Sequence, residues 1–147
     1  MTALIGLAQA TALALALQNA PQTAEAWTWT LYSDSRPLVL ANEIPDTPRL
    51  RSTLECAPGS SIVRLILYGA APAEGIAVVT SGAAAANVEV RPRRGQLQTV
   101  LRTDHPVFAA FLASGKLQVS IGAQTSPVEI DRTNLSKLRR FAELCTG

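Results

Sequence analysis

The chain has 147 residues and a formal net charge of +2, from 13 basic and 11 acidic side chains. Hydrophobic residues make up 48% of the sequence, which is enough for a folded protein with a real core. The mild positive charge is not the strongly basic balance of a nucleic-acid-binding protein. Glycine-rich phosphate loops of the P-loop or dinucleotide-binding type are absent from the sequence.

The first 26 residues have the features of an export signal. An apolar run from Leu4 to Leu17 is followed by a polar stretch and by Ala24-Glu25-Ala26, a small-x-small triplet of the kind that signal peptidase cleaves. The basic residue that usually precedes such a run is missing, because the first Lys or Arg is Arg36. We expect residues 1–26 to be a signal peptide and 27–147 to form one globular domain, periplasmic or secreted. A retained leader that anchors the protein, or a buried N-terminal helix, is the alternative.

The first half of the mature chain alternates between apolar and polar residues in short runs, which predicts β-strands. Strands are expected at 27–32, 38–42, 49–56 and 62–68. The last of these runs is apolar on both faces except at Arg64. This pattern predicts a strand that is covered on both sides, at the centre of a packed sheet.

The second half continues with short strands and adds two helices. Strands are expected at 75–80, 88–91, 97–102, 116–121 and 128–130, while 81–86 is ambiguous. The segment 92–95 predicts a hairpin turn. A short helix is expected after Asp104 as its N-cap, ending at Gly115, and a last helix from Asp131 or Thr133 to about Cys145. The predicted fold is therefore mainly β: an antiparallel sandwich or curved sheet of about eight strands with two helices in the C-terminal half.

Cys56 and Cys145 are the only cysteines, and both fall on the apolar side of their predicted elements. In an exported protein an even number of cysteines favours a disulfide, which would tie the last helix to the sheet. Two buried free thiols or a redox pair are the alternatives. A redox pair is disfavoured because the Cys-x-x-Cys arrangement is absent.

The residue types needed for common catalytic sites are sparse. His105 is the only histidine, and neither a G-x-S-x-G sequence nor a zinc-binding motif is present. We therefore predict no catalytic residue, metal site or cofactor. The acidic residues are scattered, and two of them meeting in the fold would allow a small cell-wall glycan hydrolase, which is the enzymatic alternative.

Two groups of residues are candidates for a contact surface. Arg91, Arg93 and Arg94 are the densest charge cluster, and at a hairpin tip they could meet anionic lipid, lipopolysaccharide or an acidic protein face. Trp27 and Trp29 could stack on a sugar if they are exposed, although tryptophan is more often part of a core.

The C-terminal third contains the segments VFAAFLASGKLQVSIG and PVEIDRTNLSKLRRFAELC. They resemble the ending of small exported proteobacterial proteins, including the TagO/VasI-like accessory proteins of type VI secretion and uncharacterised alphaproteobacterial periplasmic families. The resemblance implies a periplasmic, β-rich, non-enzymatic protein closed by a Cys56–Cys145 disulfide. We expect a small binding or accessory protein that acts by protein–protein contact in the cell envelope. Its partner would be another envelope protein, with no nucleic acid and no membrane span in the mature chain.

Overall fold

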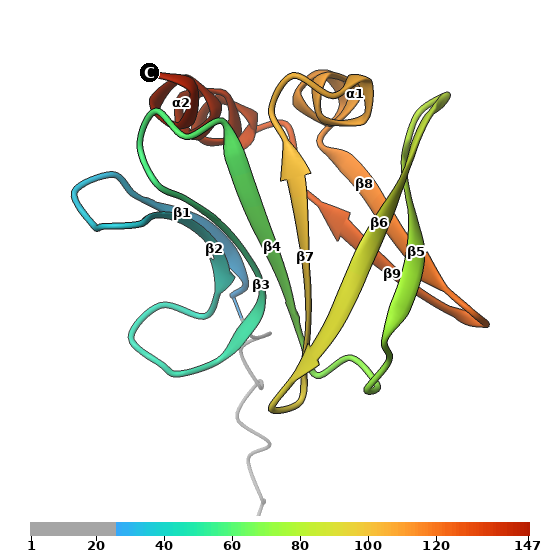
Figure 1. The fold of residues 1–147 in the computed structure, drawn as a ribbon. Coiled ribbons are helices and arrows are strands. Elements are labelled where there is room, and N and C mark those ends of the chain that lie inside the picture. Colours follow the sequence, from blue (N-terminus) through green and yellow to red (C-terminus); the bar gives the residue numbers. More distant parts are fainter. Residues whose placement is uncertain (1–25) are drawn as a thin grey trace, which may run out of the picture.

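The computed structural model describes residues 26–147, which contain nine strands and two helices (Figure 1). In chain order these are β1 (Thr28–Tyr32), β2 (Leu38–Glu43), β3 (Leu50–Cys56), β4 (Ile62–Tyr68), β5 (Gly75–Ser81), β6 (Ala84–Arg93), β7 (Gln96–Arg102), α1 (Pro106–Ser114), β8 (Lys116–Ile121), β9 (Gln124–Glu129) and α2 (Leu135–Thr146). The predicted signal peptide lies outside the described residues except for Ala26.

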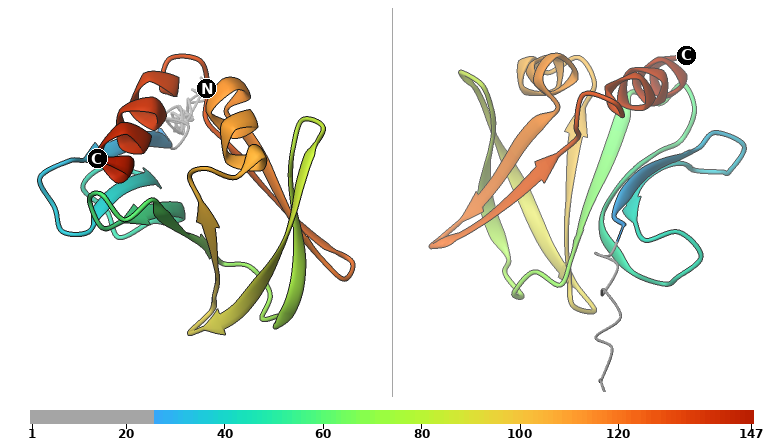
Figure 2. Two further views of the ribbon diagram at one scale, coloured as in Figure 1. Left: turned by 45° about the horizontal axis from the view of Figure 1, so that its top comes forward. Right: turned by 180° about the vertical axis from the view of Figure 1, so that it is seen from behind.

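All nine strands belong to one antiparallel sheet with the order β1-β2-β3-β4-β7-β6-β5-β8-β9. The sheet curls into a half-barrel (Figures 1 and 2). The segment 81–86, which the sequence pattern leaves ambiguous, forms the end of β5, a two-residue turn and the start of β6. The prediction of a mainly β fold, with a curved antiparallel sheet and two helices in the C-terminal half, is confirmed.

The hydrophobic core lies on the concave side of the half-barrel, because apolar residues alternate along the strands and point to that side. In β4, Val63, Leu65 and Leu67 are almost fully buried. The inward-facing core residues of the other strands include Leu40, Leu54, Leu101, Val79, Val90, Val119 and Val128. The residues that alternate with them face outward; many are polar, but Ile62, Ile76, Val78 and Val100 are apolar and exposed.

Both helices lie at the same end of the half-barrel and cover it (Figure 1). α1 packs against β5 and β6, whereas α2 packs against β1 and β2. α2 is amphipathic, and its buried side consists of Leu138, Phe141, Ala142 and Cys145. Neither helix of the described part has the length and apolarity to span a bilayer.

The sequence pattern predicts Asp104 as the N-cap of α1, but the N-cap in the structure is His105. The Nδ1 atom of His105 accepts a hydrogen bond of 3.1 Å from the Val107 N–H group, which supplies the cap. Asp104 accepts hydrogen bonds from Arg102 at 2.9 and 2.8 Å instead. These bonds hold the pKa of the Asp104 carboxyl below its ordinary value. An ion pair to the preceding strand therefore prevents the carboxylate from capping.

Cys56 and Cys145 form the predicted disulfide, with their Cα atoms 5.7 Å apart. The bond joins the end of β3 to the last turn of α2. Two main-chain hydrogen bonds reinforce the junction, from the Ser61 N–H to the Cys145 carbonyl at 3.0 Å and from the Gly59 N–H to the Leu144 carbonyl at 3.4 Å. The β3–β4 turn is thus fastened to the C-terminal end of α2.

Trp29 links the two edge strands of the sheet. Its indole N–H donates a hydrogen bond of 2.9 Å to the Glu129 carbonyl at the end of β9, and the Lys137 ammonium on α2 donates one of 2.6 Å to the Trp29 carbonyl. The indole bond therefore holds β1 near β9, although the two strands share no pairing, and the Lys137 bond holds β1 to α2.

β4 is not covered on both faces, and this part of the sequence prediction is wrong. Its outward residues Ile62 and Arg64 are exposed, and only Ile66 among the outward residues is nearly buried. The sheet curls around its core, so all of its helical cover lies on the concave side (Figure 2). The outward apolar residues of β4 are therefore surface features.

Candidate functional site

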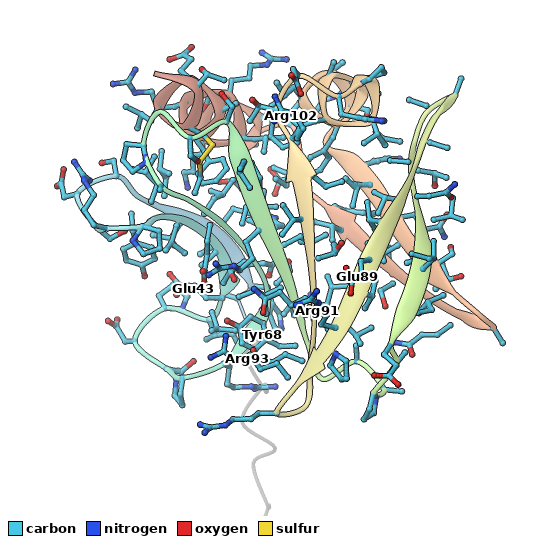
Figure 3. The ribbon with its side chains drawn as sticks, viewed as in Figure 1. Glu43, Tyr68, Glu89, Arg91, Arg93 and Arg102 are labelled. Carbon is cyan, nitrogen blue, oxygen red and sulfur yellow. A yellow bond between two sulfur atoms is a disulfide. The ribbon has the colours of Figure 1, made fainter. Side chains whose placement is uncertain are left out.

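The convex side of the sheet carries an arginine in each of four successive cross-strand rows. These residues are Arg102, Arg64, Arg91 and Arg93, which pair across the strands with Ile62, Val100, Gln98 and Gln96, respectively. Together they form a stripe from the helix-covered end of the sheet to the β6–β7 hairpin, and Figure 3 labels three of its members. We call these four residues the arginine stripe.

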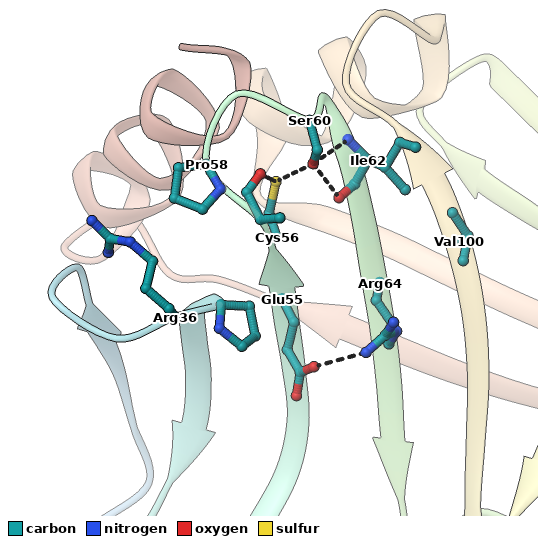
Figure 4. Close-up of a pocket in the computed structure, with 10 residues that line it drawn as sticks. Arg36, Glu55, Cys56, Pro58, Ser60, Ile62, Arg64 and Val100 are labelled. Atoms are coloured by element: carbon teal, nitrogen blue, oxygen red, sulfur yellow. Dashed lines mark hydrogen bonds and ion pairs between the residues drawn. The ribbon is translucent and has the colours of Figure 1, made fainter.

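A groove of about 460 Å³ opens on the convex side near the helix-covered end (Figure 4). Its walls come from the β1–β2 turn, the end of β3, the β3–β4 turn, β4 and β7. Much of the lining is apolar and includes Pro37, Pro58, Ile62 and Val100. We call this feature the outer groove.

Ile62 and Val100 are the exposed apolar residues of the outer groove, with 46% and 50% of their surfaces accessible. They are diagonal neighbours on β4 and β7, since Ile62 pairs with Arg102 and Arg64 pairs with Val100. Single apolar residues are common on protein surfaces and need no explanation. Two β-branched side chains that line the same hollow form an apolar patch, which is less common.

Two arginines also line the outer groove: Arg64 pairs across the strands with Val100, and Arg36 belongs to the β1–β2 turn on the other side of β3. Arg64 lies 3.5 Å from the Glu55 carboxylate in an ion pair whose side chains are 50% and 20% exposed, respectively. Arg36 donates hydrogen bonds to the carbonyls of Ser33 at 3.3 Å and Ser35 at 2.8 Å, which hold its side chain against its own turn. An ion pair with one side chain half exposed contributes about 0–1 kcal/mol, and the exposed Arg64 guanidinium is accessible to a second carboxylate.

The β6–β7 hairpin holds the predicted cluster of Arg91, Arg93 and Arg94. Arg94 and Gly95 form its two-residue turn with φ values of +48° and +77°, as a type I′ turn requires. Arg91 pairs with Glu89 at 3.0 Å. Arg93 and Arg94 form no ion pair with any residue between 26 and 147. The predicted hairpin is confirmed, and its arginines extend the arginine stripe to the tip.

The two tryptophans of the predicted contact surface lie in different environments. Trp29 is only 2% exposed and belongs to the core, so it is not available to a partner. Including it in the contact surface was wrong, because strand alternation turns it inward. Trp27 is half-buried, with the Cζ atoms of Arg51 and Arg49 at 3.9 and 5.6 Å from its ring centroid. It remains accessible, but as part of a cation–π stack.

The described residues do not assemble a recognisable catalytic group. His105 is engaged as a helix cap. The outer groove is lined by one acidic residue, Glu55. Two further cavities, of about 300 and 340 Å³, are each lined by one acidic residue, which is Glu129 in both cases. Within residues 26–147, no three histidine, cysteine or acidic side chains cluster as metal ligands would.

Comparison with known proteins gives no relative from which a role could be transferred. The chain matches no family model, no curated protein and no solved structure. The resemblance of its C-terminal third to TagO/VasI-like proteins stays a prediction. Function must therefore be inferred from the outer groove and the arginine stripe.

The sequence prediction included the hairpin arginines but missed the outer groove. The available signal was Arg64, since a charged residue inside an apolar strand face marks that face as exposed. Once that face is placed outside, Ile62 becomes a surface residue that needs a partner. Val100 could not be added from sequence alone, because only the pairing of β4 with β7 brings it beside Arg64.

Proposed function

We propose that this protein is a small exported binding protein, without enzymatic activity, that acts by protein–protein contact in the cell envelope. The observation that carries the proposal is the outer groove, where exposed Ile62 and Val100 share one lining with Arg36 and Arg64. An exposed apolar patch with a charged rim is typical of a protein interaction site. The Cys56–Cys145 disulfide supports an oxidising compartment, where such bonds persist.

The charges around the outer groove define the partner. Arg36 and Arg64 line it, and the arginine stripe continues from it towards the hairpin. The complementary ligand is an acidic segment of another protein that places one apolar side chain on Ile62 and Val100. Its carboxylates would pair with the guanidinium groups of these two arginines, whose planar donor edges suit that geometry.

The arginines at the hairpin tip and the outer groove have different roles in this proposal. Arg93 and Arg94 lie at the hairpin tip, away from the outer groove, and act mainly by attracting an acidic partner over a distance. Such residues raise the association rate and make it depend on salt. The contacts in the groove then set the lifetime of the complex, because buried contacts act mostly on dissociation.

Site-specific photocrosslinking tests where the partner binds. A photoreactive amino acid at Val100 is expected to capture one envelope protein, and the crosslinked peptide should be rich in Asp and Glu. The matched control places the same residue at Ile76, which is 66% exposed on the outward side of β5 and away from the outer groove. Equal capture from both positions, or a captured peptide without acidic residues, would contradict the proposal.

Charge removal tests the chemistry. Arg36→Gln combined with Arg64→Gln should lower capture from Val100 by about tenfold or more, since each lost charged hydrogen bond costs about 1.5–3 kcal/mol. Arg132→Gln combined with Arg139→Gln removes the same charge from exposed positions outside the groove and should leave capture unchanged. Reversal of charge at Arg93 and Arg94 should slow association without altering the crosslinked site. Unchanged capture after loss of both groove arginines would show that they do not bind the acidic partner.

A further inference from the structure

A second cavity, of about 340 Å³, lies where β9 faces β2 and β3. The right-hand view of Figure 2 shows β9 on one side of the opening of the half-barrel and β1 and β2 on the other. The lining residues are Asn42, Arg51, Ser52, Pro127, Val128 and Glu129, and we call this cavity the mouth pocket. Its volume is at the lower end of the range for small-molecule sites, so it suits a ligand of about the size of one sugar ring.

A β-bulge brings Arg51 to the mouth pocket. Glu43 pairs with Leu50 and Asn42 pairs with Ser52, so Arg51 is the extra residue between two successive pairs. Bulges change the direction of a side chain and often occur beside functional sites. Without the bulge, the strict alternation of β3 would turn Arg51 to the opposite face from Ser52.

Stacking on Trp27 holds the Arg51 guanidinium in place. Its Cζ atom lies 3.9 Å from the ring centroid, which is the distance of face-to-face contact. A guanidinium stacked by its face keeps its N–H edge free to donate, the arrangement that suits bidentate binding of a carboxylate. No acid between residues 26 and 147 forms an ion pair with Arg51, so this edge has no charged partner in the described part of the chain.

The wall of the mouth pocket also contains an unsatisfied acceptor. The Oδ1 atom of Asn42 is buried and has no hydrogen-bond donor among the described residues. Asn42 and Ser52 are directly paired and both point to the concave side, beside Trp29. A buried acceptor without a donor is unfavourable. A ligand hydroxyl that donates to the Asn42 amide oxygen, after the amide turns toward the pocket, would satisfy this acceptor.

We infer that the mouth pocket binds a small monocarboxylate that carries hydroxyl groups, with its carboxylate on Arg51 and a hydroxyl on Asn42. Arg51 is the one guanidinium of the lining, and the Glu129 side chain points outward because its neighbour Val128 is buried, so a single positive charge favours a singly charged ligand over a phosphate. A uronic acid sugar has this chemistry and this size. The inference does not depend on the outer groove, which lies on the opposite side of the sheet.

Calorimetric titration of the protein purified from an exporting host tests the site. D-Glucuronate should bind with a Kd of about 1 mM or below. D-Glucose, which lacks the carboxylate, and acetate, which lacks the hydroxyls, should each bind at least about tenfold more weakly. Absence of glucuronate binding overturns the inference, and equal binding of acetate overturns the part assigned to Asn42.

Variants of Arg51 separate recognition from folding. Arg51→Gln should abolish detectable binding, whereas Arg51→Lys, which keeps the charge and the contact with Trp27 but not the planar fork, should weaken it by about tenfold. Arg132→Gln removes an exposed arginine outside the pocket and should bind as the unaltered protein does. Binding of glucuronate by Arg51→Gln with unchanged Kd would show that the guanidinium does not recognise it.

Discussion

Gly115 ends α1 with a φ of +70°, in the left-handed region that favours glycine. Its N–H group donates to the Phe111 carbonyl and its carbonyl accepts from the Ile130 N–H group, each at 2.7 Å. A Cβ atom at this position would lie 2.2 Å from the Ile130 oxygen. The close approach of the two backbones therefore requires a residue without a side chain, and not only one that tolerates positive φ.

Gly115→Ala should lower the free energy of unfolding by at least about 2 kcal/mol, since it adds a backbone clash to the cost of the left-handed conformation. Urea denaturation measures the loss. Gly122→Ala in the β8–β9 turn is the control, because Gly122 has a φ of +55° and a Cβ atom there would have no neighbouring atom within 4 Å. It should show only the conformational cost, about 1 kcal/mol. Equal losses in the two variants would mean that the approach of Ile130 does not matter.

Asp131 organises the turn before α2. Its carboxylate accepts hydrogen bonds from the Thr133 hydroxyl, and from the Asn134 N–H at 3.1 Å and side-chain amide at 2.9 Å. The bond from Thr133, followed by those from Asn134, holds the pKa of Asp131 below its ordinary value. The ionised carboxylate is thus favoured in the folded state, and the stability it contributes is present above its unfolded pKa of about 3.9.

Asp131→Asn should lower stability at neutral pH, by about 0.5–1 kcal/mol as for loss of a helix-capping contact. The difference from the unaltered protein should persist down to about pH 4 and shrink as pH falls through the folded pKa of Asp131, where the carboxyl takes up its proton in both states. Urea denaturation at several pH values measures it. A difference that stays constant into strong acid would show that the charge of Asp131 contributes nothing.

At the scale of elements, the sequence predicts a strand well where alternation is clean and turns flank it. The predicted bounds of β4 and β8 match the structure, because β8 alternates, β4 is one short apolar run, and both end at glycine-containing turns. β6 begins at Ala84, earlier than predicted, because alanine carries almost no signal of period two. β9 includes Pro127, which suggests a loop, but an edge strand tolerates proline.

The candidate sites could be predicted only where their residues are close together in the sequence. The hairpin arginines could be predicted because their turn is local in sequence. The outer groove joins Arg36, Glu55, Ile62 and Val100, which come from four separate segments and meet only through the strand order. The mouth pocket depends on a bulge at Arg51 that shifts pairing by one residue, and strict alternation cannot anticipate such a shift.

At the scale of the whole molecule, the disulfide couples the covering helix to the outer groove. Cys56 lines the groove, Pro58 and Ser60 form its wall, and Cys145 holds this wall to α2. The residues between the two cysteines include β4 to β9, so the bond closes a loop around most of the sheet. A crosslink over a long loop acts chiefly by restricting the unfolded chain.

Cys56→Ala combined with Cys145→Ala should therefore lower the free energy of unfolding by about 2–5 kcal/mol. The unaltered protein unfolded in the presence of dithiothreitol should lose a similar amount, which separates the loss of the bond from the effect of the two substitutions. Capture from Val100 should fall as well, because the wall formed by Pro58 and Ser60 is no longer tied to α2. Urea denaturation measures the first effect and photocrosslinking the second. Unchanged unfolding after reduction would mean that the core and the main-chain bonds of Gly59 and Ser61 hold α2 without the covalent link.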